Sequence, residues 1–478
     1  MNREPNPTLS SGKADRSRML RLRLLILGMV LLAPISAYLT RVMSAINTTL
    51  AREYGINDIA MGSILAAFNV GYLIFQVPGG WLAQRFSVRR VFPFMAVCWS
   101  LSAIWFSMSR TSDSFYAARV ALGLSQAGMV PCCALVISSW VGERFRGIYS
   151  SMIGISMQIG GVIATSLTGH LVLGTFTEPP SPMAWSDVYF IYAFTGIIFA
   201  IGFYWIYRDH PLSHPWLRST SEKKIDSISR HDNERTAPNA TSVKENANDD
   251  PSPAVSIGPR SYTAWEVVVF TVFSASMWLI CLQGFFRAFA YEFFTTWFTA
   301  YLEQARGMNL EDAGNWASLP IIAFGAGPVI GGFGLDLLYR WTENKWISRS
   351  LTAVVSLGLC AIFTGIAAFV EDTRWAILFI SLGAFLASIA GPCTWVACLD
   401  ICGKRSAVIF GIMNSIGAVG AWLSPKVFGY LFNFVKTNNA DWNYVLYLLA
   451  AVNFAGALSW IFLNPNRPIV AEDEVVVV

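Results

Sequence analysis

Three arginines interrupt long apolar stretches of the sequence. Arg41 follows LRLLILGMVLLAPISAY, Arg119 lies within ARVALGL, and Arg287 lies within FFRAFAY. An arginine in the middle of a membrane helix costs about 2.5–3.5 kcal/mol on insertion scales, so such residues usually have a function. Few acidic residues share these stretches, and a guanidinium binds a carboxylate or phosphate through parallel hydrogen bonds. The arginines therefore predict an anion-binding site; for Arg41 alone, snorkelling to the membrane surface is the alternative.

Polar side chains recur at helical spacing from these arginines. Tyr38 precedes Arg41 by three residues, Tyr291 follows Arg287 by four, and Gln126 follows Arg119 by seven. Residues at these spacings share one face of a helix. We therefore expect each arginine to have a phenol or an amide beside it, although ordinary helix packing is the alternative for each of these residues taken alone.

The composition points to the lipid bilayer. The chain has 478 residues, of which 54% are hydrophobic and only 13% charged, with a mean hydropathy of +0.48; soluble proteins carry about a quarter charged residues. The first apolar run is too long for a signal peptide. The cysteines and histidines show no metal-ligand spacing, and the net charge of +4 is too dispersed for a nucleic-acid partner. We expect no metal, cofactor or nucleic acid.

Apolar stretches of about 18 or more residues predict twelve membrane helices. They form an N-terminal half within 22–207 and a C-terminal half within 265–463, joined by a polar linker at 208–264 whose composition predicts disorder and flanked by tails at 1–21 and 464–478. The predicted helices are 22–46, 60–84, 91–109, 113–140, 148–172, 188–207, 265–302, 317–338, 349–370, 375–399, 405–432 and 443–463.

The orientation follows from the basic residues of the short loops. One side of the predicted bundle carries most of them, including Arg85, Arg89, Arg90, Arg144, Arg340 and Lys404. Because lysine and arginine are enriched in cytoplasmic loops, both termini and the linker are predicted to be cytoplasmic.

An internal repeat supports the division into halves. PGGWLAQRFSVRR closes the second predicted helix, and IGGFGLDLLYRW closes the eighth; their glycine pairs lie 252 residues apart. Two six-helix halves are typical of transporters that rock about a central site. A chance match of Gly-Gly-aromatic is the alternative.

At these motifs the sequence resembles the major facilitator superfamily. GGWLAQRFSVRR is similar to that superfamily's loop between helices 2 and 3, in which an aspartate stabilises one conformation. Here Gln84 replaces the aspartate and Ser87 replaces a glycine, whereas the second copy keeps an acid at Asp336. The resemblance implies an all-α membrane fold of twelve helices and a gating loop that includes Gly80, Gln84, Arg85, Arg89, Arg90 and Asp336.

Three further stretches resemble the anion:cation symporter branch, which includes vesicular glutamate transporters, sialin, and bacterial hexuronate, galactonate and glucarate transporters. They are 118–147, 285–320 and 410–431. The resemblance implies that Arg41 and Arg287 contact a carboxylate substrate, and that Arg119, Tyr72 and Asn414 line the same cavity. With the residues that share helix faces, the predicted substrate site is Arg41, Arg287, Arg119, Tyr38, Tyr72, Gln126, Tyr291 and Asn414.

The sequence departs from this branch at its proton carriers. Thr40 precedes Arg41 where bacterial members have aspartate, and Gln126 stands where the family has glutamate. Glu292 is the remaining acid near the site, but it lies about 140° around the helix from Arg287. Coupling to H+ through Glu292, coupling to Na+, exchange, and facilitated flow all stay open.

We therefore predict a secondary active transporter of small organic anions, such as sugar acids, that works as a monomer in the plasma membrane by alternating access. A transporter-like anion sensor and a facilitative or phosphate transporter without proton coupling are the alternatives. An enzyme is not expected, because histidines and paired acids are lacking within the spans.

Overall fold

The computed structural model describes residues 7–141, 143–175, 181–210, 214–215, 274–402 and 406–466. All regular structure in these residues is helical, as predicted. The N-terminal half contains α1 Pro7–Arg41, α2 Asn47–Tyr54, α3 Asp58–Phe86, α4 Val88–Met108, α5 Ser112–Gln126, α6 Met129–Trp140, α7 Glu143–Leu173 and α8 Trp185–Ile206. The C-terminal half contains α11 Ala275–Thr296, α12 Phe298–Arg306, α13 Leu310–Thr342, the π-helical turn η3 Trp346–Leu351, α14 Thr352–Ala367, α15 Thr373–Cys402, α16 Ser406–Asn438 and α17 Asn443–Ile461.

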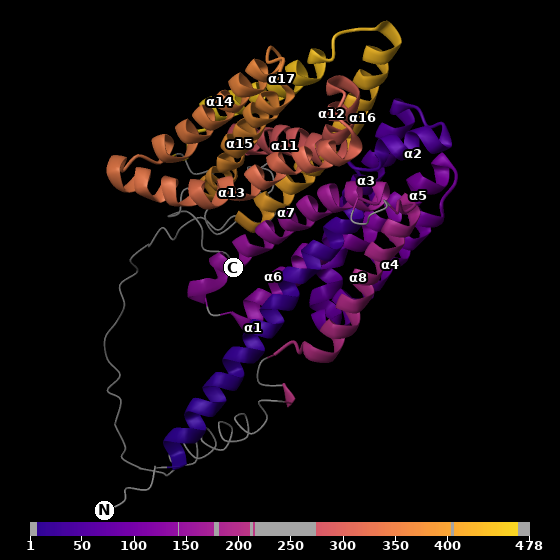
Figure 1. Cartoon of the computed structure of the whole chain (residues 1–478). Coiled ribbons are helices and arrows are strands. Elements are labelled where there is room, and N and C mark those ends of the chain that lie inside the picture. The colour runs from indigo at the N-terminus through magenta and orange to yellow at the C-terminus, as the bar shows by residue number, and fades with distance from the viewer. Residues whose placement is uncertain are drawn as a thin grey trace, which may run out of the picture.

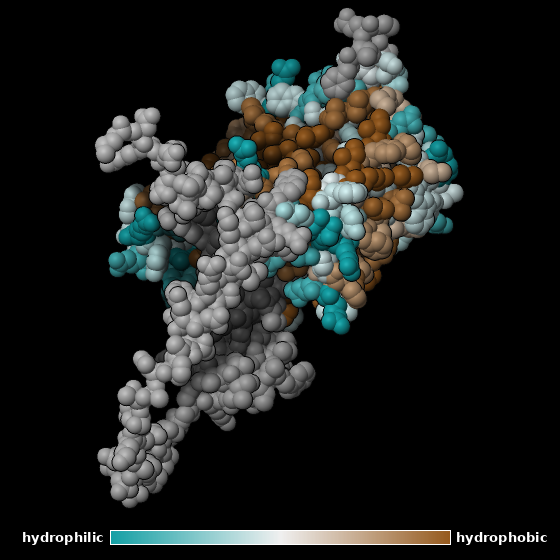
Figure 2. All heavy atoms as spheres, turned by 90° about the horizontal axis from the view of Figure 1, so that it is seen from below, coloured by the Kyte–Doolittle hydropathy of each residue, from teal (hydrophilic) through white to brown (hydrophobic). Residues whose placement is uncertain are grey.

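Ten helical segments of the described chain are long and apolar enough to cross a membrane. They correspond to ten of the twelve predicted spans. The other two coincide with the helices α11 and α16. Apolar side chains gather over the visible helices with polar ones at the margins (Figure 2), and many large hydrophobic residues are exposed, including Val77, Trp205 and Phe369. A soluble monomer rarely exposes so much apolar surface, so this surface fits contact with lipid.

Three predicted spans differ from the observed helices: the first ends early, and two are divided. The first ends at Arg41 rather than at residue 46, and α2 begins only at Asn47; α5 and α6 divide the fourth; α11 and α12 divide the seventh at Trp297. At the other end, α1 begins at Pro7, inside the predicted N-terminal tail. Most of the predicted linker and the C-terminal tail from residue 467 lie outside the described residues.

The two halves meet along two helix pairs, α3 with α16 and α7 with α13. Figure 1 shows the N-terminal half in indigo to magenta and the C-terminal half in orange to yellow, with α2 and α12 at the same end of the molecule. Near that end, Lys436 forms an ion pair with Asp58 at 2.8 Å, and the side-chain amide of Asn47 donates to the carbonyl of Thr296 at 2.7 Å. These contacts hold the halves together at the end that carries α2 and α12.

The helices α3 and α5 pack closely against each other beside Arg119. A Cβ atom at Gly71 would overlap the carbonyl oxygen of Val120, and one at Gly123 would overlap the carbonyl oxygen of Phe68. Glycine at both positions lets the two backbones touch. Gly123 lies one turn after Arg119 on α5, so its contact with the Phe68 carbonyl holds the Phe68 ring beside Arg119.

Candidate functional site

Arg41 lies at the end of α1, where the helix stops and its last carbonyls lose their helical partners. Side chains of the same half supply new partners. Arg119 donates from Nη1 to the carbonyl of Arg41 at 2.8 Å, and Tyr189 donates from its hydroxyl to the carbonyl of Val42 at 2.8 Å. One turn earlier, the amide nitrogen of Gln126 donates to the carbonyl of Ala37 at 3.0 Å. These bonds fix the position of the interrupted helix end.

Aromatic rings surround the Arg41 guanidinium. Its Cζ lies 4.4 Å from the centroid of Phe68, 5.0 Å from that of Tyr38 and 5.7 Å from that of Tyr72. Such contacts stabilise a cation through the negative faces of the rings. Nη1 also donates to the Tyr38 hydroxyl at 3.4 Å. The Arg41 side chain keeps 19% of its surface exposed, so an entering anion has access to it.

Glu292 of α11 approaches Arg41 from the other half of the molecule. Its Oε2 lies 3.9 Å from Nη2 of Arg41, and its Oε1 accepts a bond of 3.2 Å from the amide of Asn69 on α3. The residue is only 4% exposed. The sequence singled out Glu292 as the remaining acid near the site, although about 140° around the helix from Arg287. In the structure its nearest cation is Arg41.

Arg287 is the second arginine of the predicted pair, and it stands apart. No hydrogen bond or ion pair to its guanidinium is formed by any residue that the structure describes, and its Nε is buried without a partner. One turn further along α11, Tyr291 donates to Oε1 of Gln158 at 3.1 Å and packs against Phe324 at 5.0 Å. Arg287 and Tyr291 share a face, which therefore turns toward α7 and α13.

Arg119 and Gln126 are deeply buried, at 2% and 1% exposure. Both donate to α1: Arg119 to the Arg41 carbonyl, and Gln126 to the Ala37 carbonyl and, at 3.1 Å, to the hydroxyl of Thr40. Among the residues predicted to touch substrate, these two support the backbone that carries Arg41.

The remaining predicted positions divide. Tyr72 stacks on Phe68 with centroids 5.7 Å apart and so joins the Arg41 cluster. Asn414 is exposed on α16, beside Met413, which packs on Gly284 of α11. The structure thus brings Arg41, Tyr38 and Tyr72 together with Glu292, while no hydrogen bond joins Asn414 to this cluster within the described part of the chain.

Sequence reasoning missed three residues that bond to predicted residues: two near the arginines and one at the gating loop. Asn69 and Gln158 are single amides in apolar helices, and nothing in their spacing distinguishes them from packing residues. The third is Asp209, which lies just after α8. The backbone nitrogen of Arg89 donates to its Oδ1 at 3.3 Å, and the Ser87 hydroxyl donates to its Oδ2.

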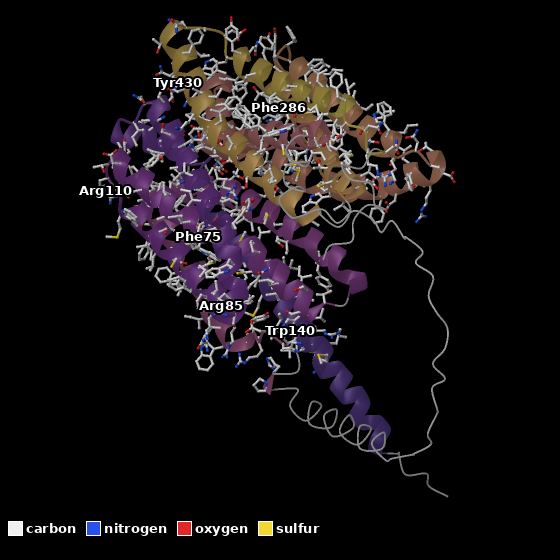
Figure 3. All side chains as sticks on the ribbon, turned by 180° about the vertical axis from the view of Figure 1, so that it is seen from behind. Phe75, Arg85, Arg110, Trp140, Phe286 and Tyr430 are labelled. Atoms are coloured by element: carbon white, nitrogen blue, oxygen red, sulfur yellow. The ribbon has the colours of Figure 1, made fainter. Side chains whose placement is uncertain are left out.

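The predicted gating loop is therefore tied to α8 of its own half. Arg89 also donates from Nε to the carbonyl of Tyr204 at 3.2 Å and stacks over that ring at 4.9 Å. Gly80 faces Pro131 of α6, whose side chain would lie 3.4 Å from a Cβ atom placed at Gly80. Gln84, Arg85 and Arg90 are exposed, as is Asp336 in the second copy. Figure 3 shows Arg85 and Trp140 at one end of the N-terminal half and Arg110 toward the other.

The part of the chain that the structure describes contains no cluster of three or more metal-ligating side chains. Arg41 of the N-terminal half and Arg287 of the C-terminal half are half-buried guanidiniums, each with a phenol one turn away on its own helix, and such groups are chemically suited to bind an anion.

The chain is similar along nearly its whole length to bacterial transporters. It is 24% identical over 456 residues to a probable sulfoacetate transporter of Cupriavidus necator, covering 95% of this chain and 97% of that protein. It is 26% identical over 436 residues to a probable galactarate/D-glucarate transporter of Escherichia coli K12, covering 89% and 92%. A probable L-galactonate transporter of the same strain is 25% identical over 460 residues, covering 96% and 93%. These relatives are transporters, in agreement with the prediction that the chain is not an enzyme.

Solved structures show the same fold. A bacterial homologue of the human lysosomal transporter Spinster, in an inward-facing and unoccupied conformation, superposes with a TM-score of 0.65 at 14% identity, covering 92% of this chain and 95% of that one. The family model of the Major Facilitator Superfamily matches residues 24–425. The resemblance found in the sequence is confirmed: the chain belongs to the Major Facilitator Superfamily.

Proposed function

We propose that this protein is a secondary transporter of small organic anions, with a doubly charged acid as its preferred substrate. The substrates for which its relatives are named, sulfoacetate, galactarate, glucarate and galactonate, are small organic acids. We further propose that twelve helices in two halves span a plasma membrane with both termini in the cytoplasm, and that the protein works as a monomer.

The observation that carries the proposal is the Arg287 guanidinium, for which no residue of the described chain supplies a hydrogen bond or an ion pair. Arg287 is half-buried and its Nε is fully buried, and a buried donor without a partner is unfavourable. No acidic side chain of the described chain pairs with Arg287. A ligand carboxylate or sulfonate supplies the missing charge, and a guanidinium matches the geometry of either group through paired hydrogen bonds.

The charge balance favours a dianion. Arg41, Arg119 and Arg287 bring three positive charges to the region, and Glu292 returns one negative charge. At least two positive charges therefore remain for the substrate, which favours a substrate with an acid at each end. The Tyr38, Tyr72 and Tyr291 phenols and the Gln158 amide are hydrogen-bonding groups that fit the hydroxyls of a sugar acid.

Alternating access follows from the placement of the two arginines on different halves. A substrate that bridges Arg41 and Arg287 ties the halves together, so binding and the rocking motion are linked. The ion pair of Asp58 with Lys436 closes one end and must break when that end opens.

The test is counterflow in proteoliposomes with sulfoacetate, galactarate, glucarate, galactonate and phosphate. We expect exchange of at least one organic dianion, and its loss in Arg41→Ala and in Arg287→Ala. Arg374→Ala, which removes an exposed arginine at the start of α15, is the matched control and keeps the wild-type rate. Binding without flux would indicate a sensor instead, and wild-type exchange by both site variants would reject the proposed site.

A further inference from the structure

Glu292 occupies the place at Arg41 that a substrate acid requires. Its carboxylate is 3.9 Å from the Arg41 guanidinium, longer than a good hydrogen bond. Its other oxygen is held by Asn69, which also donates to the carbonyl of Ala421 at 3.1 Å. The carboxylate thus neutralises Arg41 without a close bidentate contact, and a substrate acid able to make that contact displaces it.

The displaced carboxylate has few other partners. Arg119 is the other cation with an electrostatic interaction with Glu292, and its Nη1 is already engaged with the carbonyl of Arg41. The remaining titratable groups near the pair are the phenols of Tyr38, Tyr72 and Tyr291. Apart from Tyr72 on α3, the described contacts from α3 and α16 are the Asn69 amide and the Ala421 carbonyl, neither of which is charged. A buried carboxylate that loses its cation is stabilised by taking up a proton.

We propose that Glu292 is the proton carrier of this transporter and that it exchanges places with the substrate at Arg41. When the substrate acid binds Arg41, Glu292 accepts one proton from the open side and becomes a neutral carboxylic acid. When the substrate leaves on the other side, Glu292 releases that proton and pairs with Arg41 again. One proton therefore moves in the same direction as each substrate molecule. This inference rests on the proposed anion transport.

The rest of the site leaves this role to Glu292. Thr40 and Gln126, which occupy the family's acid positions, do not titrate, and Gln126 is bonded to both Thr40 and the Ala37 carbonyl. Because Glu292 lies on α11 while Arg41 lies on α1, the exchange also breaks and reforms a contact between the halves. The Arg41–Glu292 pair thereby couples protonation of Glu292 to the rocking of the two halves.

The experiment compares two assays on Glu292→Gln and on the wild type. An inward proton gradient is expected to drive accumulation of the dianion by the wild type, by about tenfold per pH unit for one coupled proton. Glu292→Gln is expected to lose this accumulation; because exchange requires no net proton movement, counterflow by the same variant reports whether its binding site still assembles. Glu371→Gln, which changes an exposed acid in the loop before α15, is the control and keeps both activities.

A second measurement does not depend on the variant folding. Purified wild-type protein in weak buffer is expected to take up close to one proton when the dianion is added, and its affinity for the dianion is expected to fall as the pH rises. Exchange by the wild type without proton uptake would overturn the role of Glu292, as would gradient-driven accumulation by Glu292→Gln. Absence of exchange in the wild type would instead count against anion transport itself.

Discussion

Arg119 donates a 2.8 Å hydrogen bond to the backbone carbonyl of Arg41, so one buried arginine positions another. Two like charges are held in one region because the donor bonds to a backbone oxygen and Phe68 lies between the cations, 5.3 Å from Arg119 and 4.4 Å from Arg41. The arrangement uses a charged side chain to cap an interrupted helix, and Arg41 depends on that cap for its place.

Substituting Arg119 is therefore expected to weaken substrate binding through Arg41. Arg119→Ala leaves the Arg41 carbonyl without this donor, at a loss of about 1.5–3 kcal/mol for a hydrogen bond to a charged group. We expect a lower melting temperature and a raised KM for exchange. Arg119→Lys keeps a cationic donor and is expected to recover part of both. Equal KM values for Arg119→Ala and the wild type would show that the cap does not position Arg41.

Gln126→Glu is expected to make exchange sensitive to pH. The Gln126 amide donates to the Ala37 carbonyl and to Thr40. A protonated carboxyl keeps one donor, whereas an ionised carboxylate has none and repels the carbonyl. Exchange should thus be preserved at low pH and fall as the pH rises through the titration of the introduced acid. The measurement is the initial rate of counterflow across pH 5–9, with Glu292→Gln as the background so that the native acid does not contribute; a flat profile would contradict the expectation.

Much of the fold was predictable because it depends on local patterns. Apolar run lengths gave the helices, and the arginine and tyrosine spacings gave side chains that share a face, as Arg41 with Tyr38 shows. The pairing of Glu292 with Arg41 was not predictable, because it depends on how two halves far apart in sequence pack together. The helix break after Arg41 was missed for a related reason: the residues 42–46 are apolar enough to continue a helix, and side chains from α5 and α8 stabilise the break.

The contact of α3 with α5 offers a test of packing beneath the site. Gly71→Ala places a methyl group against the Val120 carbonyl oxygen, and we expect the helices to separate at a cost of about 1–3 kcal/mol, as for other overpacked positions. The measurement is the melting temperature of the purified protein. Gly358→Ala on α14 is the control, since a Cβ there meets no atom within 4 Å; it is expected to melt at or slightly above the wild-type temperature. Equal melting of the two variants would mean that α3 and α5 adapt without strain.

Ser87 carries an unusual backbone for a residue with a side chain. Its φ is 81°, in a region that favours glycine and that costs other residues about 1–3 kcal/mol, and its hydroxyl donates to Asp209. Ser87→Ala removes that bond and keeps the strain, whereas Ser87→Gly removes both. We therefore expect Ser87→Ala to melt below Ser87→Gly, the reverse of the usual order of alanine and glycine. Asp209→Asn, which keeps an acceptor oxygen, should weaken the loop less than Asp209→Ala. If Ser87→Ala proved the more stable of the two, the backbone at this position would not be strained.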